Sequence, residues 1–438
     1  MKIFRIYLLM IAMLTMLVSS VWSQEKVKIK KDSTFSGYES ESTLGGARSV
    51  QNRLQKNNEI KDFRRDEKRS LGDKWYLFKK KVNNKTGLRF GINYGMTVMG
   101  ASTGVNDSSE KEAYGGVLEL DFYKRIIGKN SLNKGSINMI MDWRHAYPGS
   151  IAPATLHIES GSYVSPAVEF TSYSFRPIEL FYHQVLFNGI VELAIGKIDP
   201  FNFYTQHPLI NGFTDFQNAG FSISSAAAWP TSGMGGVLGL TLLKNRNLFL
   251  KIGIHDIIGD PLEDYSWFSF GDELLEGRSI RTYEVVWARS HKEELTNSMS
   301  ITYWNADEIT RENKFGEEIL ISSDNQGMAF NFNWLFDDAF QAVIAGGYSK
   351  GGEEGLAKNY IVLAHSYQMN NGDAVGTGVN WFDPISDERA QTTMEVYYRY
   401  RASRFTSLTP TFQWVINPSR NEQVNHLFYV GIRLRLTF

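Results

Sequence analysis

The chain has 438 residues, a formal net charge of −1, no Cys, 38 Gly, 28 Phe, 21 Tyr and 10 Trp. The absence of Cys excludes a disulfide framework and thiolate chemistry, and the near-zero net charge gives no support to a nucleic-acid partner. Abundant aromatic residues and Gly, with only 11 Pro, favour many strands joined by tight turns.

Residues 1–23 predict a cleaved signal peptide. Lys2 and Arg5 form a short positive region, an apolar run follows over 6–18, and Val21-Trp22-Ser23 precede the expected cleavage before Gln24. A membrane-spanning anchor helix is the alternative, but the apolar run is shorter than the ~20 residues that a bilayer requires. No later stretch reaches that length, so we expect an exported mature chain.

Residues 24–70 differ from the rest of the chain because they are dense in charge and poor in apolar residues. Such a composition buries too little apolar surface for a core of its own. Val50, Leu54 and Phe63 could line one side of a short helix. We therefore predict a charged periplasmic extension that is partly helical or disordered. A plug in the lumen of a barrel is the alternative, since the segment is polar enough for a wet pore.

From about residue 71 to the C-terminus, apolar and polar residues alternate with period two in several separate segments. Alternation of this kind is the signal of strands with two different faces. Turn-rich stretches such as 83–87, 370–373 and 417–421 separate the segments. The clearest segments are Leu88–Met99, Gly115–Tyr123, Met328–Phe336, Met394–Arg401, Leu408–Ile416 and Phe428–Phe438.

The last eleven residues show the pattern most clearly. One row is wholly apolar, from Phe428 through Ile432 to Phe438, and the other row carries Arg433 and Arg435. Side chains on a strand point alternately to opposite faces. This strand therefore has an apolar face that could meet lipid and a polar, cationic face that could line a lumen.

A soluble exported β-sandwich is the competing fold. It would bury charged residues inside strands, such as Glu395, Arg399 and Arg433, in a dry core, which is costly, whereas a water-filled lumen accepts them. Residues 71–438 number 368, or 23 per strand and loop for sixteen strands. We predict an all-β fold, a transmembrane antiparallel up-and-down β-barrel of sixteen strands with a long inward-folded loop. Spacing alone also permits fourteen or eighteen strands.

Three parts of the sequence resemble the OprB-type carbohydrate-selective porins. The C-terminal match consists of a Glu-bearing, Tyr-rich strand over 393–400, a P-x-x-Q-x-x-x-N-P hairpin over 410–418 and a G-x-R closing strand at Gly431. The middle match joins the Gly-Lys strand over 191–199 to the P-x-x-x-x-G return within 226–236. A weaker match covers 71–75 and 88–94.

The resemblance extends over 71–438 and implies a sixteen-stranded outer-membrane barrel that passes sugars by facilitated diffusion, with no cofactor and no energy source. The charged segment 24–70 and divergent loops depart from the family's pattern. These departures leave the sugar preference open.

The loop over 199–229 is the first candidate site. A sugar-selective pore needs polar groups for hydroxyls and aromatic rings for pyranose faces, and this loop carries both. It is too long for a periplasmic turn, so we expect it to fold inward and narrow the lumen. An ordinary extracellular loop is the alternative. The candidate sugar-binding residues at this constriction are Lys197, Asp199, Phe201, Tyr204, His207, Asp215 and Trp229.

Charged residues predicted to face the lumen form the second candidate set. Opposite charges on adjoining strands can set a field across a pore. Ladders that merely satisfy one another are the alternative. The predicted pore-wall residues are Glu192, Glu395, Arg399, Arg401, Arg433 and Arg435.

Other functions are less favoured by the sequence. It lacks a G-x-S-x-G elbow, a metal-binding His spacing and a phosphate loop, so we predict no enzyme, no metal site and no cofactor. A general porin and a structural or adhesin barrel remain alternatives. The expected partners are carbohydrates, outer-membrane lipid and the barrel-assembly machinery, which would bind the C-terminal strand; a homo-oligomer is left open.

Overall fold

The computed structural model describes residues 33–34, 37–60, 71–128, 131, 133–222, 224–227, 229–243, 247–259, 271–290, 293–312, 318–322, 324–350, 357–386 and 388–438. The predicted signal peptide, residues 24–32 and residues 61–70 with Phe63 lie outside the described residues. The chain divides into two compact units, Met1–Ser33 and Thr34–Phe438, and the barrel strands belong to the second. Among the described residues, no helix has both the length and the apolar character needed to cross a membrane.

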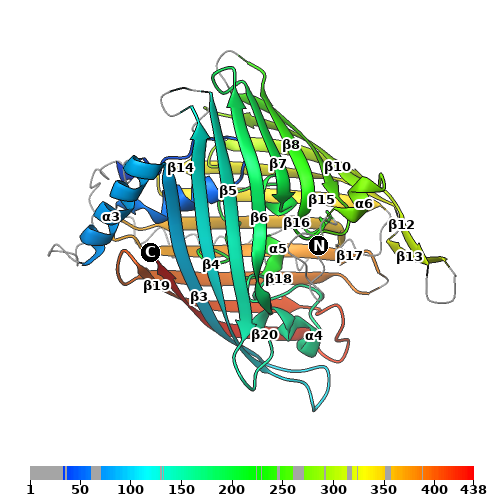
Figure 1. Cartoon of the computed structure of the whole chain (residues 1–438). Coiled ribbons are helices and arrows are strands. Elements are labelled where there is room, and N and C mark those ends of the chain that lie inside the picture. Colours follow the sequence, from blue (N-terminus) through cyan, green and yellow to red (C-terminus); the bar gives the residue numbers. More distant parts are fainter. Residues whose placement is uncertain are drawn as a thin grey trace. The chain divides into compact units, whose positions relative to one another are not determined.

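Sixteen strands close into one antiparallel barrel, which confirms the predicted fold and strand number (Figure 1). Strands that are consecutive in the ring pair with each other, and β20 closes the ring against β3, with Arg433 opposite Thr97. The strands are β3 (Leu88–Ala101), β4 (Glu112–Ile127), β5 (Lys134–Ala146), β6 (Tyr173–Leu186), β7 (Val191–Ile198), β8 (Gly233–Thr241), β9 (Leu248–Asp256), β10 (Ser279–Ala288), β11 (Ser298–Ala306), β14 (Asn325–Phe336), β15 (Phe340–Lys350), β16 (Ala357–Gln368), β17 (Ala374–Pro384), β18 (Gln391–Arg401), β19 (Thr406–Ile416) and β20 (His426–Thr437).

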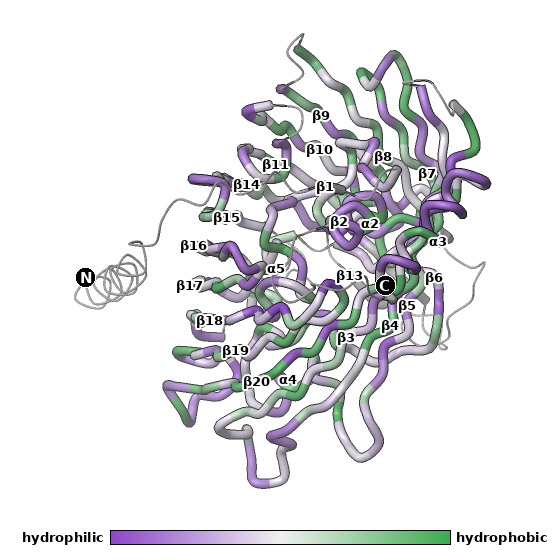
Figure 2. The backbone as a smooth tube through the Cα atoms, turned by 90° about the vertical axis from the view of Figure 1, so that its left-hand side faces the viewer, coloured by the Kyte–Doolittle hydropathy of each residue, from purple (hydrophilic) through white to green (hydrophobic). Residues whose placement is uncertain are grey.

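The period-two pattern sorts side chains between the two faces of the wall. On β20, Val430 is 61% exposed and Ile432 42%, whereas Tyr429 and Arg433 are fully buried. Figure 2 shows hydrophobic and hydrophilic residues alternating along the strands. The predicted strand faces are therefore confirmed on this strand: the apolar row points outward and the polar row points into the barrel.

The connections at the two ends of the barrel differ in length. One end, here called the short-turn end, holds turns such as 187–190, 337–339 and 402–405 between consecutive strands. The other end, here called the long-loop end, includes the connections 147–172 and 199–232. Within these and other connections lie η1 (Pro153–Thr155), α4 (Leu156–Ser160), η2 (Pro200–Asn202), α5 (Ala219–Ser222), α6 (Asp272–Leu275), β12 (Ile309–Glu312) and β13 (Glu318–Ser322).

The barrel begins later than the sequence pattern predicted. Residues Leu71–Thr86 form the helix α3, and the first barrel strand starts at Leu88, so the predicted start at about residue 71 is wrong. Tyr76 and Lys79 are buried, at the three-residue spacing of one helix face. The ring of Tyr76 stacks on Phe405 in a turn at the short-turn end.

Residues 37–58, here called the N-terminal segment, lie against the inward face of the wall. They include the helix α2 (Val50–Asn57) and are followed by β2 (Glu59–Ile60); the remaining short strand is β1 (Ser33–Thr34). Contacts of α2 with β3, β4 and β5 place it within the ring of strands (Figure 2). The predicted periplasmic extension is thus incorrect for residues 37–58, because their charged side chains find partners of opposite charge on the wall.

Candidate functional site

The connection 199–232, here called the lumen loop, contacts opposite sides of the wall. The Thr205 amide donates to Glu284 on β10 at 2.7 Å. At the other side, the Arg433 guanidinium on β20 donates to the carbonyl oxygen of Asp215 at 3.0 Å. Strands β10 and β20 stand eight positions apart in the ring of sixteen, so they face each other. The loop therefore spans the lumen.

Glu395 on β18 holds the middle of the lumen loop. Its two carboxylate oxygens accept hydrogen bonds from the backbone amides of Gln217 at 2.8 Å and Asn218 at 2.9 Å. The Asn218 side chain also donates to Gln413 on β19 at 3.0 Å. A carboxylate that accepts two adjacent amides fixes the direction of the backbone, so Glu395 positions the loop as well as lining the wall.

Asp215 on the lumen loop lies among three basic residues, Lys56 on α2, Arg399 on β18 and Arg433 on β20. These four residues are here called the Asp215 cluster. One Asp215 oxygen lies 3.5 Å from Arg399 Nη1, and the other lies 3.9 Å from Lys56 Nζ on the N-terminal segment. Burial raises the pKa of Asp215, but the surrounding cations, chiefly Lys56 and Arg399, and a hydrogen bond from Thr214 outweigh burial and hold that pKa below its usual value. Asp215 is therefore a buried anion at neutral pH.

A second polar group, here called the carboxylate cluster, consists of Glu119, Asp121, Asp142 and Glu169 with the arginines that neutralise them. Arg144 on β5 lies 2.9 Å from Asp142 and 3.4 Å from Glu169. Burial raises the pKa of Glu169, yet the surrounding arginines, chiefly Arg48 and Arg144, hold that pKa below its usual value. In both clusters, charges of opposite sign lie within 4 Å of each other inside the barrel.

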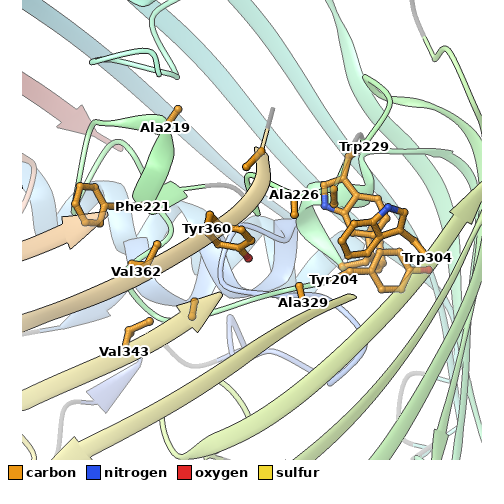
Figure 3. Close-up of a cluster of buried hydrophobic side chains, with 14 of the residues drawn as sticks. Tyr204, Ala219, Phe221, Ala226, Trp229, Trp304, Ala329, Val343, Tyr360 and Val362 are labelled. Atoms are coloured by element: carbon orange, nitrogen blue, oxygen red, sulfur yellow. The ribbon is translucent and has the colours of Figure 1, made fainter. Parts of the chain in front are cut away.

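The aromatic residues of the lumen loop pack against each other. Tyr204 stacks on Trp229 with ring centroids 5.5 Å apart, and Trp229 in turn lies 5.8 Å from Trp304 on β11 (Figure 3). Tyr204 is fully buried and its hydroxyl lies 3.2 Å from His255 Nε2 on β9. These rings pack against one another and against β11, which holds the loop to the wall.

The remaining candidate sugar-binding residues lie near the point where β7 ends and the lumen loop begins. The Asp199 carboxylate accepts the Phe201 amide at 3.0 Å and so caps η2, and Phe201 packs at the edge of the apolar cluster. Lys197 is buried at the end of β7. His207 is buried, and burial lowers its pKa to about 4, so its ring is neutral at pH 7.

The predicted wall residues other than Glu395 fall into three places. Arg399 and Arg433 belong to the Asp215 cluster. Arg401 and Arg435 line an open pocket at the short-turn end, which is also lined by residues of the N-terminal segment. Glu192 on β7 is buried beneath that segment and accepts a hydrogen bond from the Thr43 hydroxyl at 2.8 Å.

The predicted sites include Glu192 and Asp215, which contact the N-terminal segment, but they omit several other residues that connect this segment to the wall. Arg53, Glu119 and Lys56 are central to the two clusters, but none was predicted. Glu119 and Asp121 occupy the inward row of β4 in an alternating strand, which was the available signal. Arg53 and Lys56 lie in a segment whose composition alone resembles disorder, so no local pattern identified them.

Comparisons with known proteins agree with this geometry. Residues 354–438 match the family model described as carbohydrate-selective porin, OprB family, which confirms the predicted resemblance over that part. The high-pH structure of Pseudomonas putida OprB has a TM-score of 0.66 at 14% identity, covering 83% of this chain and 97% of that chain, and this likeness shows the fold.

Two further structures show less similarity. The low-pH structure of the same Pseudomonas putida protein has a TM-score of 0.49 at 11% identity, covering 85% of this chain and 99% of that one. A mutant of the Rh. blastica porin has a TM-score of 0.47 at 10% identity, covering 80% of this chain and 100% of that one. No curated protein sequence matches the chain.

Proposed function

We propose that this chain, which matches the OprB family of carbohydrate-selective porins over residues 354–438, is an outer-membrane channel for passive diffusion of carbohydrates. The observation that carries the proposal is the lumen loop, which spans a closed barrel from Glu284 to Arg433. A loop held on opposite walls narrows the pore and places polar groups in the path of a solute. Diffusion down a gradient requires no cofactor and no energy source.

Sugar recognition in this proposal rests on the Asp215 cluster and the carboxylate cluster. Sugar hydroxyls both donate and accept hydrogen bonds, so a constriction with carboxylates on one part and guanidinium groups on another can replace their water. Asp215 and Arg399 are the residues that we expect to contact sugar. Tyr204 and Trp229 hold the shape of the constriction, since their rings pack against each other.

The membrane placement follows from the two faces of the wall. The outward apolar row, with Phe428, Val430 and Ile432 exposed on β20, fits contact with lipid acyl chains. In bacterial outer-membrane barrels the short turns face the periplasm, and we assign the short-turn end to that side. Export through the predicted signal peptide and assembly through the C-terminal strand complete the proposal.

Flux measurements with the full-length mature protein in liposomes test the proposed function. We expect monosaccharides to enter the liposomes faster than disaccharides, and sugar to block the ion conductance of single channels in planar bilayers. Conductance without block would indicate a general porin, and no conductance would leave a structural or adhesin barrel.

Substitutions in the constriction identify the residues that act on sugar. Asp215→Asn and Arg399→Gln should each change monosaccharide flux and weaken the block by sugar severalfold. The matched control is Asp107→Asn, which removes a carboxylate from an exposed connection at the long-loop end. Equal flux and block in Asp215→Asn, Arg399→Gln and the control would refute the assigned constriction, although the channel function itself would stand.

A further inference from the structure

The N-terminal segment is attached to the lumen wall at several separate anchors, most of them polar. The first anchor is Glu41. Its carboxylate pairs with Arg89 on β3 at 2.7 Å and with Lys134 on β5 at 3.4 Å, and it also contacts Arg125 on β4. The Tyr123 hydroxyl donates to the same carboxylate at 2.9 Å. One acidic side chain of the segment thus occupies a cationic site on three adjacent strands near the short-turn end.

The second anchor is Arg53 on α2, which carries the opposite charge. Its guanidinium lies 2.6 Å from Glu119 and 3.0 Å from Asp121, both on β4. All three side chains are under 9% exposed. Each anchor charge therefore faces wall charges of the opposite sign, and exchanging the two anchors would place like charges together.

The third anchor is the turn at 42–44. The Ser42 hydroxyl donates to Glu192 at 2.6 Å, and the Thr43 amide donates to the same carboxylate at 3.1 Å. Leu44 lies over Gly239 on β8, where an added Cβ would come within 2.7 Å of Leu44 Cδ1. The absence of a side chain at Gly239 therefore leaves the space that Leu44 occupies.

The segment also contacts the lumen loop. The Gly46 amide donates to the carbonyl oxygen of Asn202 at 2.7 Å, and Lys56 belongs to the Asp215 cluster. Arg48 pairs with Glu169, in the connection 147–172, at 3.0 Å. The N-terminal segment thus lies between the wall strands and the two loops that enter the barrel, in the path proposed for the solute.

Polar contacts dominate this interface. Its apolar part includes Leu44 and a buried cluster of Tyr38, Val50 and Leu54 with Tyr76, Tyr123 and Ile140. Interfaces within a chain that are largely polar permit relative motion, because separation exposes little apolar surface and water can replace the lost partners. The chemistry of the interface thus fits a segment that can leave the wall without unfolding the barrel.

We propose that residues 37–58 are a lumen plug, docked by charge complementarity, which must move for solute to pass. This inference rests on the proposed channel function. Docked, the plug holds Lys56 at the Asp215 cluster and narrows the pore. Displaced, it frees the wall carboxylates Glu119, Asp121 and Glu192 to face the lumen. The plug is therefore an autoinhibitory contact built from the chain's own N-terminal segment.

A reversible cross-link tests whether the plug must move. The chain has no native Cys, so Leu44→Cys with Gly239→Cys introduces one pair at a contact where a Cβ at position 239 would lie 3.8 Å from Leu44 Cγ, the position of the new sulfur. We expect oxidation to lower single-channel conductance at least tenfold and dithiothreitol to restore it. The single variants Leu44→Cys and Gly239→Cys are the controls and should not respond to either reagent. Equal conductance of the oxidised and reduced double variant would overturn the proposal.

Releasing the plug tests the same proposal from the opposite direction. Glu41→Gln with Arg53→Gln removes two anchors without changing the net charge, and should raise conductance severalfold and make the segment accessible to trypsin. The matched control is Glu388→Gln with Arg420→Gln, which neutralises an exposed pair at 3.2 Å. Heat-modifiable migration on gels verifies that each barrel has folded. Unchanged conductance in a folded release variant with a cleavable segment would overturn the plug.

The outcomes separate the plug from the proposed function. If the release variant conducts ions but sugar neither enters the liposomes nor blocks the current, the carbohydrate channel fails while the plug stands. If sugar flux is normal and equal in the locked and released forms, the plug fails while the channel stands.

Discussion

Arg53 on α2 and Glu119 on β4 form an ion pair, with 2.6 Å between Nη2 and Oε2. Their side chains are 8% and 4% exposed, so water screens the pair very little. The same guanidinium group also contacts Asp121. Removing the arginine would leave two carboxylates close together and buried, whereas removing one carboxylate would leave the arginine with a partner.

We predict that Arg53→Gln unseats the N-terminal segment, at a cost of about 3–5 kcal/mol in docking free energy, because an unpaired buried charge remains. Limited proteolysis of the folded barrel measures this effect as faster cleavage within 37–58. Combining Arg53→Gln with Glu119→Gln should restore part of the protection, since the unpaired carboxylate is removed with its partner. Equal cleavage of the wild type and Arg53→Gln would contradict the prediction.

The strands of the barrel could be predicted from sequence because the period-two signal is local. Each residue of β20 shows which face it occupies through its own polarity and that of its neighbours, and Val430 and Arg433 lie as predicted. The start of the barrel was harder to place. Tyr76 and Lys79 are part of a helix, but the segment around them is too mixed in polarity for a clear period.

The candidate site could be predicted only in part, because its contacts join residues distant in the chain. Glu395 and Arg433 were predicted to line the pore because they interrupt apolar alternation within strands. Asp215, whose carbonyl oxygen accepts a hydrogen bond from Arg433, was predicted on the lumen loop, but this particular pairing was not. Lys56 and Arg53 could not be placed, since the sign of a charge does not identify which of many opposite charges it will meet.

Asp215 should control the ion selectivity of the pore. Asp215→Asn removes the carboxylate that lies between Lys56 and Arg399, so the local potential becomes more positive. We expect the permeability ratio to shift severalfold toward anions, read from the reversal potential in a KCl gradient. Asp107→Asn, on an exposed connection, should leave the ratio unchanged. A shift toward cations, or none, would refute the placement of Asp215 in the conduction path.

His207 should make the stability of the lumen loop depend on pH. Burial lowers its pKa from 6.5 to about 4, so the folded protein binds fewer protons than the unfolded chain between these values. The stabilisation that comes from the neutral His207 ring is fully present above pH 6.5 and is lost as the pH falls toward 4. The free energy of unfolding changes by about 3 kcal/mol over this range.

Comparison with a variant isolates His207 from the other titrating groups. His207→Gln keeps a side chain that can accept the Leu209 amide bond, at 3.3 Å in the native loop, but it does not titrate in this range. Denaturant midpoints at pH 7.5 and 4.5 should differ more for the wild type than for the variant. Equal differences would contradict the burial of a neutral ring at this position.

The packing of Tyr204 against β9 gives a steric prediction. A Cβ at Gly253 would lie 1.7 Å from the Tyr204 hydroxyl oxygen, so Gly253→Ala cannot be accommodated unless that ring moves. We expect the substitution to destabilise the protein by about 1–3 kcal/mol and to alter conductance, because Tyr204 anchors the lumen loop through Trp229.

Tyr204→Phe removes the clashing oxygen and leaves the nearest ring carbon 2.9 Å away. In the Gly253→Ala background, Tyr204→Phe should recover most of the lost stability and conductance. In the wild-type background, Tyr204→Phe should lower the free energy of unfolding by about 1 kcal/mol, because the hydroxyl contact with His255 is lost. Thermal unfolding of all four proteins completes a double-mutant cycle, and additive effects of the two substitutions would show that Tyr204 does not occupy this position.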